Sequence, residues 1–166
     1  MTPESPPSGT VANRAHYFPV RVYYEDTDAG GVVYHATYLG FAERARTEFL
    51  RAAGLPHHEL MSAHGLVFVV RSAHVEYQRP ARLDDSLTVV SRIVGLGGAS
   101  VTLDQRVMRD DAVLARLRIG LVAADLSEGR ARRIPRAWRD MFAALLVEEE
   151  SRGDHGGDQK SPRKES

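Results

Sequence analysis

The chain of 166 residues contains no cysteine, and this absence excludes disulfides, zinc–thiolate sites and a thiol nucleophile. It also has no excess of either charge, because Lys plus Arg and Asp plus Glu each number 22. A protein whose main partner is nucleic acid needs a basic excess or a basic stripe to neutralise phosphates. We therefore expect no nucleic-acid partner.

Long apolar runs are missing as well. No segment approaches the about 20 apolar residues of a membrane span, so no such span is expected. The first sixteen residues lack the apolar core of a signal peptide. The composition, 43% hydrophobic and 27% charged, is ordinary for a globular domain. These features predict a cytoplasmic protein with a single domain.

The two ends of the chain differ in composition from its middle. Residues 1–15 are rich in Pro, Ser, Thr and Gly, and residues 148–166 are polar and contain several glycines. Such segments bury too little apolar surface to fold, so both are predicted to be disordered. The folded domain is predicted to span residues 16–147.

Within that domain, hydrophobic periodicity predicts one strand, a long helix, four more strands and a last helix. The strands are expected at 17–24, 66–78, 86–96, 99–109 and 112–125, and the helices at 36–54 and 136–149. The pairs Gly97–Gly98 and Asp110–Asp111 are typical of hairpin turns, which makes the last three strands antiparallel. The order predicts an α+β domain in which a curved antiparallel sheet of about five strands covers one apolar helix.

The most unusual segment joins the first strand to the long helix. Asp28 is followed by the glycine pair Gly30–Gly31, and the helix is expected to begin near His35 or Ala36. Glycines let a ligand approach the main chain, and the first N–H groups of a helix lack partners within it. These donors favour an oxyanion, and a nearby carboxylate can attack a carbonyl or take a proton from water. The joint is therefore a candidate acyl-binding site.

Other interpretations of the same residues remain open. Asp26 and Asp28 are residue types common in turns and helix caps, and a glycine pair often marks only a loop. His35 is equally consistent with an ordinary helix-start residue. Glu25, Asp26, Asp28 and His35 could together bind a metal, but their spacing matches no standard ligand set, and we expect no metal.

The segment YYEDTDAGGVVYHATYLGFAERARTEFLR, residues 23–51, resembles the signature of hotdog-fold acyl-CoA thioesterases of the 4-hydroxybenzoyl-CoA thioesterase type. It is most similar to the branch associated with the Tol–Pal cell-envelope system. A second segment, VEYQRPARLDDSLTVVSRI at residues 75–93, resembles another region of that family. The resemblance implies a hotdog fold, in which a curved antiparallel sheet wraps a long helix. It also implies a homo-oligomer, a dimer or tetramer, with active sites between subunits.

The resemblance also implies roles for particular residues. Asp28 would be the nucleophile or general base, and the backbone N–H of His35 would bind the oxyanion. Gly30 and Gly31 would shape the oxyanion site, and Tyr34 and Tyr38 would line the acyl pocket. No cofactor is expected, because the reaction needs only water and the thioester.

The implied substrate is acyl-CoA, and its phosphates would need cations at the rim of the site. Arg71, Arg79 and Arg82 are the candidates, although they could instead pair with Asp84 and Asp85. An acyl group on an acyl carrier protein is an alternative substrate, with a basic cluster at 130–133 as its docking site. A further alternative is a non-catalytic acyl-binding scaffold of the cell envelope, and lipid metabolism is the expected setting for the enzyme.

Overall fold

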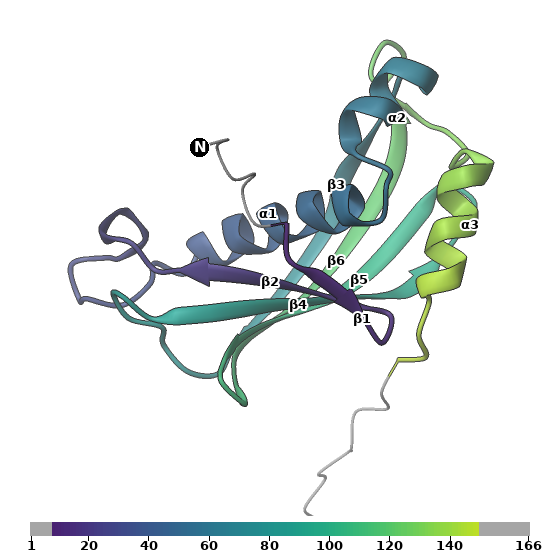
Figure 1. Cartoon of the computed structure of the whole chain (residues 1–166). Helices are drawn as coiled ribbons and strands as arrows, with labels where there is room; N and C mark the ends of the chain where they lie inside the picture. The colour runs from purple at the N-terminus through teal and green to yellow at the C-terminus, as the bar shows by residue number, and fades with distance from the viewer. Residues whose placement is uncertain (1–7, 150–166) are drawn as a thin grey trace, which may run out of the picture.

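A computed structural model describes residues 8–149 of the chain, and it has an α+β architecture. One long helix, α1 (Thr37–Ala52), lies against the concave face of a curved sheet, as Figure 1 shows. The strands are β1 (Thr10–Ala12), β2 (Ala15–Arg21), β3 (Leu66–Tyr77), β4 (Ser86–Leu96), β5 (Ser100–Arg109), β6 (Ala112–Asp125) and β7 (Arg130–Ala131). Two shorter helices, α2 (His57–His64) and α3 (Arg136–Leu145), lie near one end of the sheet.

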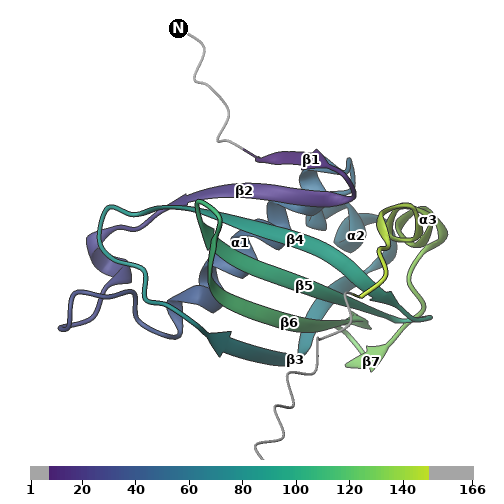
Figure 2. The ribbon, with the colours of Figure 1, turned by 90° about the horizontal axis from the view of Figure 1, so that it is seen from below.

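All strand pairs in the sheet are antiparallel, in the order β1-β2-β4-β5-β6-β3, and β7 pairs with the end of β6. Figure 2 shows the opposite face of the sheet, with α1 behind it. The predicted fold class is confirmed. The five predicted strands correspond to β2 through β6, and the two additional strands are short.

The helix packs on the sheet through the apolar face that its sequence predicts. Tyr38, Phe41, Ala42, Ala45 and Phe49 recur at helical spacing and are all buried. The inward-facing side chains of the strands, such as those of β6, complete the same hydrophobic core. The helix is therefore held along its whole length, which fixes the position of the chain segment that leads into it.

β3 forms one edge of the sheet, and its free edge has no strand beside it among residues 8–149. The strand is twelve residues long, and its middle is exposed on both faces. Val69 and Val70 are 46% and 47% exposed. A long, partly apolar edge strand of this kind is a ready template for pairing with another strand.

The structure differs from the sequence prediction in several places, one of which is the end of α3, at Leu145 and not at residue 149. Thr10–Ala12 forms β1 and pairs with β2, although residues 8–15 fall in the segment predicted to be disordered. The folded domain therefore begins earlier than residue 16. Tyr24, predicted within the first strand, lies in a short 3-10 helix and is 82% exposed. The helix α2 was not predicted. Residues 1–7 and 150–166, also predicted to be disordered, lie outside the described residues.

Candidate active site

Asp28 is the first residue of a tight turn between β2 and α1. An isolated bridge pairs Thr27 with Val33, and the Asp28 N–H donates to the Val32 carbonyl at 2.9 Å. Gly31 has φ of 76°, a conformation that favours glycine, and its N–H donates to the Asp28 carbonyl at 3.0 Å. The glycine pair thus closes the turn that presents Asp28.

The Asp28 carboxylate is oriented by the same turn. Its Oδ1 atom accepts the Gly30 N–H at 2.8 Å. A Cβ atom at position 30 would lie 3.1 Å from this Oδ1 atom, so only glycine avoids a close contact with the carboxylate. The second carboxylate oxygen accepts no hydrogen bond within residues 8–149. Asp28 is exposed in the single chain and does not line its main cavities.

The segment before α1 carries unpaired backbone donors. The Tyr34 N–H donates to the Asp26 carbonyl, and the Thr37 N–H donates to the Tyr34 carbonyl, both at 2.9 Å. In the described part of the chain, the N–H groups of His35 and Ala36 donate to no backbone acceptor. The helix begins at Thr37, slightly later than predicted, so these two donors lie in the turn that precedes it.

A residue far along the sequence fixes this turn. The Tyr77 hydroxyl, at the end of β3, donates to the His35 carbonyl at 2.6 Å. Its ring contacts the ring of Tyr38 edge-on, with centroids 5.4 Å apart. Sequence reasoning missed Tyr77, because only the fold brings it to a residue 42 positions earlier.

The two tyrosines predicted to line the acyl pocket have different environments. Tyr34 is exposed, and its ring lies 4.4 Å from that of His35, centroid to centroid. Tyr38 is 2% exposed, and its hydroxyl accepts the Ala81 N–H at 3.0 Å. Burial raises the pKa of Tyr38. Its described contacts give Tyr38 a structural role beneath the turn.

The neighbouring acids have separate roles. Asp26 is 5% exposed, and its Oδ2 atom accepts the Tyr23 N–H at 2.8 Å. It therefore caps the short 3-10 helix, which is the turn-and-cap role considered from the sequence. Glu25 is exposed. Among the described residues, no group of three or more His, Cys, Asp or Glu side chains is placed to hold a metal ion.

The three arginines predicted to bind CoA are all exposed. Arg82 lies beside the Asp28 turn, since its backbone forms a bridge with Val32. Arg79 lies two residues after the end of β3, and Arg71 lies in the middle of that strand. The expected partner Asp85 instead forms an ion pair with Arg109, at 2.8 Å between Nη1 and Oδ2.

A cavity of about 140 Å³, which we call the inner cavity, lies between α1 and the concave face of the sheet. Its lining is mainly apolar and includes Phe49, Phe68 and Phe142. The polar side chains that line it are Glu43, Arg46 and Thr47 from α1 and His57 from the start of α2.

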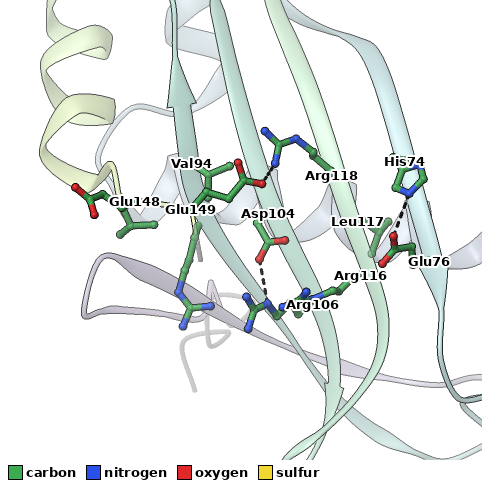
Figure 3. Close-up of a pocket in the computed structure, with 12 residues that line it drawn as sticks. His74, Glu76, Val94, Asp104, Arg106, Arg116, Leu117, Arg118, Glu148 and Glu149 are labelled. Carbon is green, nitrogen blue, oxygen red and sulfur yellow. Dashed lines mark hydrogen bonds and ion pairs between the residues drawn. The ribbon is translucent and has the colours of Figure 1, made fainter. Parts of the chain in front are cut away.

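A second hollow, of about 170 Å³, lies on the sheet face opposite α1 and is drawn in Figure 3. Arginines from β4, β5 and β6 line it, together with Asp104 and Glu76. The segment that follows α3 closes one side, where Glu149 pairs with Arg118. Most of these charges have partners within the chain, and Asp28 does not line the hollow.

Comparison with known proteins identifies the family. Residues 22–146 match the profile of the thioesterase-like superfamily. Acyl-CoA thioesterase YbgC of Haemophilus influenzae is 42% identical over 128 residues, which cover 77% of this chain and 94% of that protein. Acyl-CoA thioester hydrolase YbgC of Escherichia coli is 46% identical over 121 residues, covering 72% of this chain and 90% of that protein.

Solved structures agree with the sequence relatives. The crystal structure of a probable thioesterase from Bartonella henselae superposes with a TM-score of 0.70 at 40% identity. The match covers 73% of this chain and 99% of the other. No helix among the described residues is long and apolar enough to cross a membrane. The match over nearly the whole folded domain shows that this chain belongs to the thioesterase-like superfamily, as its resemblance to the hotdog thioesterases predicted.

Proposed function

We propose that the chain hydrolyses acyl-CoA to a carboxylic acid and free CoA, with Asp28 as the catalytic carboxylate. The family membership and the names of the YbgC relatives support the reaction class. The observation that supports the assignment of the site is the turn itself. It orients one oxygen of Asp28 through Gly30 and leaves the N–H groups of His35 and Ala36 without backbone acceptors.

In this proposal the thioester carbonyl binds to the His35 N–H, which stabilises the negative charge that develops on its oxygen. Asp28 then either attacks the carbonyl carbon or takes a proton from a water molecule that attacks it. The C–S bond breaks in both routes, and the CoA sulfur leaves and is protonated. In the nucleophilic route, water afterwards hydrolyses the acyl–Asp28 anhydride and regenerates the carboxylate.

We further propose that the active enzyme is a dimer joined through the β3 edges. The exposed, twelve-residue edge supports this pairing. Tyr77, which holds the His35 turn, lies at the end of the same strand. A partner chain on this edge would cover the exposed Asp28 region and remove it from bulk water.

The CoA phosphates are proposed to bind Arg79 and Arg82 at the rim. Arg82 is joined through its backbone to the Asp28 turn, and neither arginine side chain has an ion-pair partner within residues 8–149. Arg71 lies further along β3 and would contact CoA only in the assembled dimer. A cytoplasmic location and a role in lipid metabolism belong to the same proposal, and fractionation of cells tests the location.

Substitution of Asp28 by Asn tests the proposal. The variant keeps the shape of the side chain and an oxygen that can accept the Gly30 N–H, but it loses the carboxylate. We expect thiol release from acyl-CoA to fall by at least about 10² in kcat, the usual contribution of a positioned base. Asp111→Asn is the matched control, because Asp111 is an exposed residue of the turn between β5 and β6 and is not a candidate site residue. Equal rates for Asp28→Asn and the unmodified enzyme would remove Asp28 from the mechanism.

A further inference from the structure

Arg46 on α1 is a buried cation without an acidic partner. It is 8% exposed, and its only hydrogen bond within residues 8–149 runs from Nη1 to the Gln105 Oε1 atom at 2.8 Å. None of the ion pairs among the described residues includes it. Burying a charge is costly unless it is paired, so this arrangement needs an explanation.

The structure holds the guanidinium firmly in place. The Gln105 Nε2 atom donates to the Ala42 carbonyl at 2.9 Å and to the Ser91 Oγ atom at 2.8 Å. These two bonds orient the amide so that its oxygen faces Arg46. Gln105 and Ser91 are themselves fully buried. The network is neutral, however, and it satisfies only one of the five N–H groups of Arg46.

Arg46 lines the inner cavity, where the nearby ionisable groups are Glu43 and His57. Burial lowers the pKa of Arg46, and the negative charge of Glu43 partly opposes this effect. Glu43 is exposed, so its charge is screened by water. The pKa of His57 is lowered by burial and then by Arg46, which favours the neutral imidazole. The cavity therefore contains a fixed cationic donor within a mainly apolar wall.

The size of the cavity limits what can reach this donor. Its volume of about 140 Å³ is close to that of the roughly 150 Å³ cavities in proteins that hold one benzene molecule. An acyl group of about six carbons, or a single ring, is therefore the largest that fits without rearrangement.

The cavity and the catalytic turn come together only across the dimer that we propose. Thr37 and Arg46 are about 14 Å apart along α1 at 1.5 Å per residue, whereas six carbons with bonds of about 1.5 Å span less than 8 Å. If β3 pairs antiparallel with its copy about its midpoint, Tyr77 faces Leu66 of the partner subunit. The His35 turn of one subunit then lies at the Phe68 end of the other subunit's cavity.

We infer that Arg46 determines substrate specificity, and that the enzyme prefers acyl groups of about six carbons that carry an oxygen acceptor at the end opposite the thioester. This inference rests on the proposed function. The acyl chain lies against the apolar wall, and its terminal oxygen accepts a hydrogen bond from the guanidinium. A plain alkyl chain of the same length leaves Arg46 unsatisfied and excludes the water that could solvate it.

The test compares kcat/KM for hexanoyl-CoA, 6-hydroxyhexanoyl-CoA and adipoyl-CoA with the full-length enzyme. We expect at least one of the oxygenated substrates to exceed hexanoyl-CoA by about tenfold or more, the usual effect of a hydrogen bond to a charged group. The better of the two identifies the preferred oxygen as hydroxyl or carboxylate. An equal or faster reaction with hexanoyl-CoA overturns the inference and leaves the proposed hydrolysis intact.

Two variants of the network sharpen the test. Arg46→Met keeps the length of the side chain and should abolish the preference, whereas Arg44→Met, an exposed change on the same helix, should retain it. Gln105→Glu offers Arg46 a carboxylate within the chain and should also reduce the preference. An unchanged preference in a folded Arg46→Met variant overturns the inference. If that variant does not fold, the comparison of the three substrates with the unmodified enzyme still tests the inference. No thiol release from any acyl-CoA would instead overturn the proposed function.

Discussion

Replacing Tyr77 by Phe removes one hydrogen bond at the start of α1 and keeps the surrounding aromatic packing. The hydroxyl donates to the His35 carbonyl at 2.6 Å, and the ring remains available to Tyr38 at 5.4 Å between centroids. The lost bond joins the edge strand β3 to the turn that presents the proposed oxyanion donor. The substitution therefore tests the effect of the position of that turn without changing the aromatic packing beneath it.

The expected effects differ between stability and catalysis. Loss of one neutral hydrogen bond typically reduces the free energy of unfolding by about 1 kcal/mol, and exposure of Tyr77 places this case at or below that value. Removing an oxyanion donor altogether costs about 10²–10³ in rate, so a donor that is only displaced should cost about tenfold in kcat. KM should change little, because the affected bond forms mainly in the transition state.

Steady-state thiol release and urea unfolding measure the two effects in the same preparation. Tyr24→Phe is the control, because Tyr24 is 82% exposed and its hydroxyl forms no hydrogen bond within the described residues. A Tyr77→Phe enzyme that is less stable but has an unchanged kcat would refute the reasoning, since the bond would then serve folding alone.

Two further predictions concern the turn and the pH dependence of stability. Gly31→Ala should lower the free energy of unfolding, measured in urea, by about 1–2 kcal/mol. An alanine Cβ at position 31 would contact no other atom, so the whole cost comes from the left-handed backbone conformation, with φ of 76°. Gly30→Ala should instead lower kcat, because its Cβ would crowd the Asp28 carboxylate, and the reverse pattern would contradict this reading. Burial lowers the pKa of His16 below 6.5, opposed by its bond to the Ser8 carbonyl and by Glu48. The contribution of His16 to stability should be complete above pH 6.5 and lost as pH falls through the lowered pKa, and His16→Phe should flatten this loss in urea titrations.

The sequence predicted the regular elements well because their signals are local. β4 and β6 have the predicted boundaries, set by turn residues such as Gly97–Gly98 and Asp110–Asp111. The apolar stripe of α1 also follows from spacing alone. By contrast, α2 buries only Leu60 and has no clear apolar face, so its sequence does not distinguish it from a loop. β1 is stabilised by pairing with β2, which overrides a composition typical of disorder.

The predicted site residues illustrate the same limit. Asp28, Gly30, Gly31 and His35 are neighbours in sequence, so a short motif could place them together, and the roles assigned to them stay predictions. The groups that position or complete the site come from strands far along the chain. Tyr77 reaches the His35 carbonyl, and Gln105 reaches Arg46 59 residues away. Neither contact leaves a periodic or motif signal in the sequence.

The positions of Asp28 and of the inner cavity within one subunit favour the proposed dimer. Asp28 is exposed and does not line the inner cavity, whereas that cavity contains a buried cation and has no described contact with the Asp28 turn. The Asp28 turn and the inner cavity are each chemically incomplete within one subunit. A carboxylate in bulk water is poorly placed for catalysis, and an unpaired buried arginine lowers the stability of the fold. Both halves border the exposed edge strand, with Tyr77 at one end and Phe68 near the other. Pairing two such edges antiparallel would place the Asp28 turn of each subunit at the mouth of the other subunit's cavity, so we expect activity to be lost when the proposed dimer is separated.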